Sequence, residues 1–130
     1  MKIVVLALLT TFLFACGGEE NVIVGNRTSM EVKKVYNAGE VVKGEMVRAE
    51  FIVKNTGEYP LVIADVSTSC SCTVSDYTKD PIQPGETGKV IGNVDTDRVA
   101  GSKVDKAITI LANTKPSKTE LKIKATIVNK

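Results

Sequence analysis

The sequence contains no histidine and no tryptophan, and aromatic residues of any kind are few. Among 130 residues there are three phenylalanines, three tyrosines and three cysteines. Without histidine, neither a Ser-His-Asp nor a Cys-His catalytic arrangement can be built, and the most common metal ligand is missing. The scarcity of aromatic rings and a net charge of +2 give no reason to expect a nucleic-acid partner. Glycine-rich phosphate loops, HExxH and EF-hand patterns are also absent from the sequence, so we predict that the protein is not an enzyme.

The N-terminal residues have the organisation of a bacterial secretion signal. Lys2 precedes an apolar run from Ile3 to Phe14, which is shorter than the roughly 20 residues of a membrane-spanning helix and matches the apolar region of a signal peptide. The run closes on Leu13-Phe14-Ala15-Cys16, followed by Gly17-Gly18, and this pattern resembles the lipobox of bacterial lipoproteins. The resemblance implies cleavage after Ala15 and attachment of lipid to Cys16. The alternatives are an ordinary cleavable signal with an unrelated cysteine and an uncleaved membrane anchor.

The predicted lipid also determines where the mature protein resides. Two or more acyl chains anchor a protein stably to a membrane, whereas a single chain binds only marginally. We therefore predict a location in the bacterial cell envelope, lipid-anchored at the outer membrane and facing either the periplasm or the outside. The domain organisation follows: residues 1–15 are a signal peptide, residues 16–29 carry the lipid and form a flexible tether, and residues 30–130 form one domain.

From Met30 onward, apolar and polar residues alternate with a period of two, which predicts strands with one buried face. Turn-forming residues such as Gly57 and Pro84 fall between the alternating stretches. Short strands at intervals of about 8–12 residues predict an all-β sandwich or barrel. Seven strands are expected: Val32–Tyr36, Met46–Lys54, Leu61–Ser67, Cys72–Ser75, Lys89–Asp95, Lys106–Ala112 and Thr119–Val128.

The alternation also predicts which residues form the core. The stretch Leu61–Val66 is nearly continuously apolar, which is typical of a central strand or of one buried on both faces. Lys124 falls on a polar face and should be exposed. The residues expected in the core are Val47, Phe51, Ile63, Ile110, Ile123 and Ile127.

Cys70 and Cys72 are the remaining thiols if Cys16 carries the lipid. In a flat strand their Cα atoms would lie about 6.6 Å apart, beyond the usual disulfide separation of about 5.5–6 Å, so a bond would need a turn or bulge. Three interpretations remain open. The pair is structural, either as two small apolar residues or as a local disulfide; it takes part in thiol exchange; or it binds a soft metal such as Cu(I), with Met30 or Met46 as a thioether ligand.

Several short motifs follow one another in a specific order. They are Asn37-Ala38-Gly39, Gly44-Glu45, Phe51-Ile52-Val53-Lys54-Asn55-Thr56-Gly57, Pro60-Leu61-Val62-Ile63, Ser69-Cys70-Ser71-Cys72-Thr73, Pro81-Ile82-Gln83-Pro84-Gly85-Glu86, Gly101, Ile110 and Asn113-Thr114. This series resembles a bacterial family known only as domain-of-unknown-function family 1573, which usually has glycine in place of Ser71 and tends to have phenylalanine in place of Asn37. The resemblance covers Tyr36 to Val128. It implies an immunoglobulin-like β-sandwich related to domains of ciliary and centrosomal proteins, and it implies no activity.

Two functions from different classes are compatible with these observations. The first is a lipid-anchored, non-enzymatic binding or scaffolding domain that needs no cofactor and has another envelope protein as its partner. The alternative is a thiol-based redox or copper-handling protein that uses Cys70 and Cys72.

Overall fold

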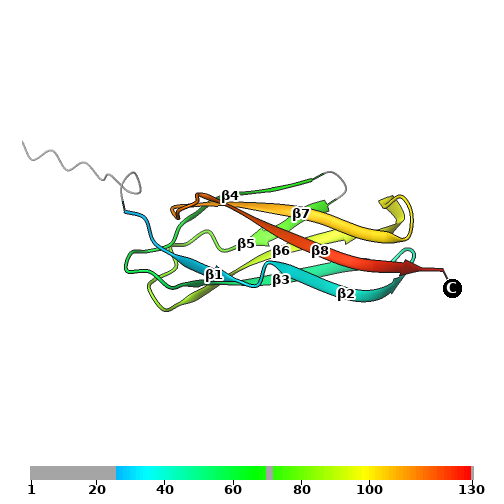
Figure 1. Cartoon of the computed structure of the whole chain (residues 1–130), viewed down its shortest axis with the longest axis horizontal. Helices are drawn as coiled ribbons and strands as arrows, with labels where there is room; N and C mark the ends of the chain where they lie inside the picture. The colour runs from blue at the N-terminus through cyan, green and yellow to red at the C-terminus, as the bar shows by residue number, and fades with distance from the viewer. Residues whose placement is uncertain (1–25, 70–71, 130) are drawn as a thin grey trace, which may run out of the picture.

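The structure of the protein is a computed structural model, which describes residues 26–69 and 72–129. These residues form eight β-strands and one short 3-10 turn, arranged as two stacked sheets (Figure 1). The predicted all-β sandwich is therefore confirmed. The strands are β1 (Met30–Val32), β2 (Val35–Val42), β3 (Met46–Asn55), β4 (Ile63–Thr68), β5 (Cys72–Tyr77), β6 (Thr87–Asp95), β7 (Lys103–Ala112) and β8 (Lys118–Val128), and the 3-10 turn η1 is Thr96–Arg98.

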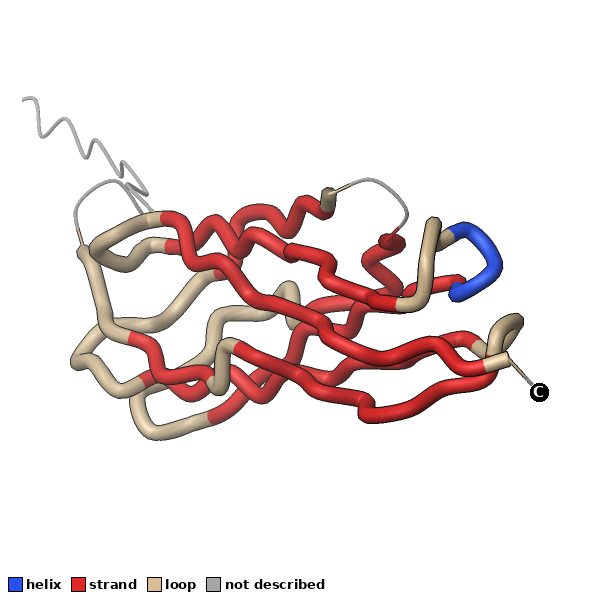
Figure 2. Tube along the Cα trace, turned by 45° about the vertical axis from the view of Figure 1, so that its right-hand side comes forward, coloured by secondary structure: helices blue, strands red, loops and turns tan. Residues whose placement is uncertain are grey.

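Each sheet contains four strands. The first has the order β1-β3-β6-β5 and the second the order β2-β8-β7-β4. Neighbouring strands are antiparallel, except that β2 and β8 run parallel. The two layers extend along the same direction in Figure 2, with the turns gathered at the two ends.

The chain passes from one sheet to the other between β1 and β2. Val32 pairs with Val53 in the first sheet, whereas Val35 pairs with Lys122 in the second. The expected single strand Val32–Tyr36 is thus divided at Lys33 and Lys34, which is why the structure has one strand more than predicted. When a strand leaves its sheet, the edge of the neighbouring strand beyond that point is left without a hydrogen-bonding partner. This matters for function.

The core lies between the two sheets and is built from the inward positions of the strands. Along β3, exposed and buried residues alternate at every position, as expected for a strand with one buried face. All six residues predicted for the core are buried, and Lys124 is exposed. Aromatic packing is limited: Tyr36 meets Phe51 edge-on, with ring centroids 6.2 Å apart, and aliphatic side chains supply most of the remainder.

The central position predicted for the strand Leu61–Ser67 is wrong. β4 pairs with β7 alone, so it lies at the edge of its sheet and not at its centre. The register shifts between Ile63 and Asp65, and the intervening residue Ala64 is exposed. Leu61 precedes the strand and is buried through an isolated bridge to Ile82. The apolar run Leu61–Val66 therefore consists of a connection in which Leu61 is buried, followed by the first residues of an edge strand.

The folded region also begins before residue 30, so that the last residues assigned to the tether belong to the domain. Thr28 is buried and forms an isolated bridge with Thr114. Its backbone N–H donates to the carbonyl of Asn113 at 2.9 Å, and its hydroxyl donates to Asn55 Oδ1 at 2.8 Å. These contacts fix the point at which the chain joins the domain.

Asn55 links three segments at this end of the sandwich. Its fully buried side chain donates from Nδ2 to the carbonyls of Tyr59 (2.7 Å) and Ile82 (2.8 Å). Its Oδ1 accepts from the Thr28 hydroxyl and from the Gly57 N–H. A Cβ atom at Gly57 would overlap Thr28, so only glycine fits there without rearrangement. The motif Asn55-Thr56-Gly57 is accounted for by structure.

Candidate functional site

Most of the residues predicted to carry chemistry lie outside the described residues. This applies to Cys16 and Cys70, while Cys72 is described only by its backbone, which begins β5 and pairs with Val94. Lipidation of Cys16 stays a prediction, as do the disulfide, redox and metal interpretations of Cys70 and Cys72.

β4 and β5, the strands on either side of Cys70, are both described. β4 ends and β5 begins toward the end of the sandwich that carries η1, opposite the end where residue 26 lies (Figure 1). Ser69 is held there by its N–H, which donates to the Ala107 carbonyl at 3.0 Å. Met46 lies on β3, separated from the start of β5 by β6. Met30 lies at the opposite end of the sandwich, which separates it from Cys72.

In residues 26–69 and 72–129, no three side chains from among aspartate, glutamate and cysteine come together as a metal-binding group. Over the same ranges, no helix has the length and apolar character needed to cross a membrane.

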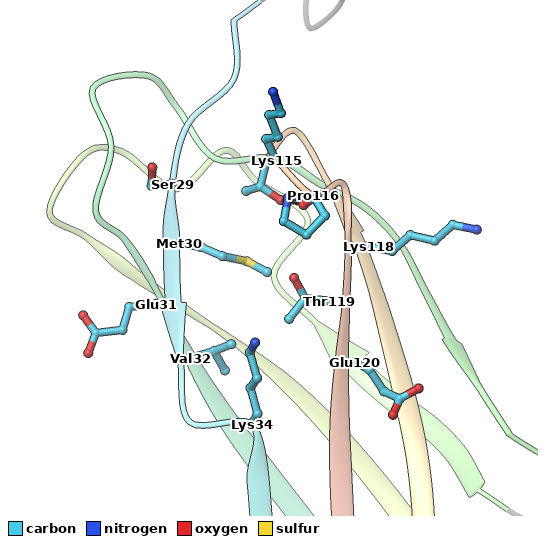
Figure 3. Close-up of a pocket in the computed structure, with 11 residues that line it drawn as sticks. Ser29, Met30, Glu31, Val32, Lys34, Lys115, Pro116, Lys118, Thr119 and Glu120 are labelled. Carbon is cyan, nitrogen blue, oxygen red and sulfur yellow. Dashed lines mark hydrogen bonds between the residues drawn. The ribbon is translucent and has the colours of Figure 1, made fainter.

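A groove of about 470 Å³ lies between β1 and the start of β8 (Figure 3). β1 and the residues after it form one side through Met30, Val32 and Lys34, and the β7–β8 turn and β8 form the other. The Met30 side chain points into the groove from β1, toward Thr119 and Pro116 (Figure 3). The floor therefore combines apolar surface with a hydroxyl group.

The groove exists because the chain changes sheets. β2 begins to pair with β8 at Lys122, whose N–H donates to the Lys34 carbonyl at 2.7 Å. Backbone groups of alternate residues in a strand point the same way, so the N–H and C=O of Lys118 and Glu120 also face this side. In the described part of the chain, no strand pairs with residues 118–121 on the side that faces β1. A short length of open sheet edge thus borders the groove.

The charges around the groove are mostly basic. Lys34, Lys115 and Lys118 contribute three ammonium groups, against the carboxylates of Glu31 and Glu120. In Figure 3 the Lys34 side chain rises into the groove, whereas Glu31 points away from it. The arrangement can accept an extended peptide through backbone hydrogen bonds, with an acidic side chain near Lys34.

Sequence reasoning missed this groove. Its two sides are far apart in the chain, and the open edge results from which strands pair, which a single sequence does not state. The one local signal is the dipeptide Lys33-Lys34, which interrupts the apolar residues Val32 and Val35 at the point where the strand divides.

The fold defines the class of the protein as an all-β domain with an immunoglobulin-like sandwich. The chain belongs to the family described as "Protein of unknown function (DUF1573)", which matches residues 29–127. The predicted family resemblance is thereby confirmed. No curated protein matches the sequence.

Solved structures support the fold. A protein of unknown function from Porphyromonas gingivalis W83 aligns with a TM-score of 0.70 and 21% identity, over 84% of this chain and 51% of that one. This chain thus spans about half the length of that relative. The PapD-like domain 7 of human CEP192 aligns with a TM-score of 0.61 and 10% identity, over 80% and 88% of the two chains. The secreted serine protease VesC of Vibrio cholerae aligns with a TM-score of 0.62 and 9% identity, over 77% of this chain and 23% of that one. At these identities the similarity concerns the fold alone.

Proposed function

We propose that the protein is a lipid-anchored, non-enzymatic binding domain of the bacterial cell envelope, which holds an extended segment of another envelope protein in the groove between β1 and β8. The lipobox pattern around Cys16 supports the anchor and the compartment. The groove and its open strand edge support binding as the activity.

The observation that carries this proposal is the unpaired edge of β8 at Lys118 and Glu120, which borders a partly apolar groove. An extended peptide that lies along such an edge gains backbone hydrogen bonds, and its alternate side chains can enter the groove. Met30 and Val32 supply the apolar surface for those side chains, since both are only half-buried.

The occupant that fits is a segment in which apolar and acidic residues alternate. An apolar side chain would contact Met30, and a neighbouring carboxylate would lie near Lys34, with Lys115 and Lys118 adding positive charge nearby. The groove lies at the end of the domain where the chain leaves for Cys16. Because residues 17–25 can reach about 30 Å at most, the partner segment would be held close to the membrane.

The proposal can be tested with a blocked hexapeptide in which valine and glutamate alternate. In NMR titrations of the full chain, this peptide should shift the Met30 methyl signal and the amide signals of Lys118 and Glu120. Glu120→Pro should weaken binding at least about tenfold, because proline removes an N–H that faces the groove and no bond to β7. Glu120→Ala keeps that N–H and is the matched control.

A second variant changes charge without touching the backbone. Lys34→Glu should reverse the preference, so that a valine–lysine hexapeptide binds better than the valine–glutamate peptide. Signal changes confined to other surfaces, or equal binding of both peptides to the unaltered chain and to Lys34→Glu, would contradict the proposal.

A further inference from the structure

The first sheet has a second open edge, on the other side of the point where the chain changes sheets. β1 covers β3 only at Val53–Asn55, and among the described strands none pairs with Met46–Ile52 on this side. Thr56 donates its N–H toward Ser29 on the β1 side, whereas Asn55 donates toward Glu86 on the β6 side. The N–H and C=O groups of successive residues in a strand point to opposite sides. The N–H and C=O groups of residues 46, 48, 50 and 52 therefore all face the open side.

The side chains of these same four residues lie on the outer face of the sheet. Met46 is 59% exposed and Ile52 is 52% exposed, and they are two of the four large apolar residues that are exposed in the described part of the chain. Between them stand Arg48 and Glu50, whose side chains are in contact at 3.3 Å and open to solvent. The order along the edge is therefore apolar, basic, acidic, apolar.

This order is complementary to itself when read in the opposite direction. If two β3 strands pair antiparallel about a two-fold axis at Ala49, Arg48 of one chain lies opposite Glu50 of the second copy, and Met46 lies opposite Ile52. These residues are also the ones whose backbone groups face the edge, so each such pair is a hydrogen-bonded pair of the ladder. Opposite charges placed directly across a ladder stabilise it, and so do apolar pairs.

No neighbouring register has this property. Only shifts of two residues keep the outward backbone groups aligned, and a shift in one direction places Arg48 opposite Arg48. A shift in the other direction places Glu50 opposite Glu50. Like charges directly opposite each other are destabilising, so the charge pattern selects the register centred on Ala49.

A hollow borders one part of this open edge. A hollow of about 320 Å³ lies beside the edge at Glu50–Ile52, between β3 and the start of β2. The Tyr36–Phe51 ring contact closes the core beneath this region. Val35, which is 41% exposed, lines the hollow together with Ile52 and extends the apolar surface available to the second copy.

The geometry points to a homodimer of this chain, formed by antiparallel pairing of the two β3 edges into one continuous sheet with the strand order β5-β6-β3-β3-β6-β5. The interface is isologous, since the same surface of each chain meets its copy across a two-fold axis. It lies on a different strand from the groove, so it does not depend on peptide binding there.

Charge exchange tests this dimer. The mass of the full chain, purified in a mild detergent, would be followed by light scattering over a range of concentrations, with the detergent contribution subtracted. Arg48→Glu should raise the dissociation constant at least about tenfold, because two opposite-charge pairs become two like-charge pairs. The double variant Arg48→Glu with Glu50→Arg restores opposite charges and should restore dimerisation. Lys103→Glu makes a similar change of charge at an exposed position on β7, in the other sheet, and should have no effect.

Three outcomes would overturn the dimer. The first is an unaltered chain that remains monomeric up to about 1 mM, a concentration that would still reveal weak association. The second is a dimer that is insensitive to Arg48→Glu. The third is a double variant that folds, as judged by circular dichroism, but stays as dissociated as the single variant.

Discussion

Two asparagine side chains, Asn55 and Asn113, hold together the end of the sandwich where the chain joins the domain. Asn55 connects the start of the domain to two turns through four side-chain hydrogen bonds. Asn113 acts in a similar way: its Oδ1 accepts from the Val62 N–H at 2.8 Å, and its Nδ2 donates to the carbonyls of Asn26 and Pro60. Both residues fall in the sequence motifs Asn55-Thr56-Gly57 and Asn113-Thr114. Their hydrogen bonds show that these motif positions maintain structure.

Asn55→Ala should therefore be strongly destabilising. It removes the side-chain partners of the Thr28 hydroxyl, the Gly57 N–H and the Tyr59 carbonyl, while the Ile82 carbonyl still accepts from the Leu61 N–H. Each buried group left unsatisfied costs about 1–3 kcal/mol. We expect a loss of at least about 3 kcal/mol in the free energy of unfolding, measured with urea. Asn37→Ala is the control, because that exposed side chain accepts only from the Gly39 N–H and its loss should cost about 1 kcal/mol or less. Equal losses in the two variants would show that the Asn55 hydrogen bonds do not stabilise the domain.

At the scale of the elements, β3 and β8 are the strands whose faces the sequence predicts most clearly. Phe51→Ala in β3 should lower the free energy of unfolding by about 3–5 kcal/mol, since it leaves a cavity in a core with few other aromatic rings. Lys124→Ala in β8 should change it by no more than about 0.5 kcal/mol. Urea unfolding of both variants measures the difference, and similar effects would mean that the assigned faces are wrong.

The sequence predicts the strands themselves better than it predicts which strands pair. The alternation in Met46–Lys54 and Thr119–Val128 is enough to assign both strands and their buried faces, and the observed strands are each one residue longer. The change of sheet at Lys33 and Lys34 was not predictable, because the residues on either side are suited to strands in either sheet. The edge position of β4 was missed for a related reason: Leu61 is as buried as a central-strand residue, but it is buried by Ile82 and not by strand neighbours.

The same contrast between local sequence and strand pairing applies to the candidate site. The thiols of Cys70 and Cys72 could be identified from residue type alone, which requires no knowledge of the fold. The groove between β1 and β8 could not, since it depends on pairing between residues about ninety positions apart in the chain. Residue types such as Met30, Lys34 and Thr119 carry no signal of their own until the fold brings them together.

At the scale of the whole molecule, the two ends of the sandwich have different surroundings in the proposed arrangement. In the proposal the end with residue 26 and the groove faces the membrane, whereas β4 ends and β5 begins toward the opposite end (Figure 1). A partner bound in the groove would therefore lie at the other end of the domain from the start of β5.

The anchor itself can be tested by Cys16→Ser. Without the thiol that accepts the lipid, processing should stop and the larger precursor should accumulate, as seen by mass on a denaturing gel after fractionation of the cell envelope. Cys72→Ser is the control, since it leaves the lipobox pattern unchanged and should be processed normally. Cleavage of Cys16→Ser to the mature size with release from the membrane would mean that Cys16 is not the lipidation site.

Amide hydrogen exchange of the full chain, with and without the valine–glutamate hexapeptide at saturation, tests the binding function most directly. The amides of Lys118 and Glu120 should exchange at least about tenfold more slowly in the complex, because each would then donate to the added strand and exchange only when it opens. The amide of Lys122 already donates to Lys34, so its exchange should not change. If Lys118 and Glu120 exchange at the same rates with the peptide bound, the peptide does not extend β8, and the proposed function is wrong.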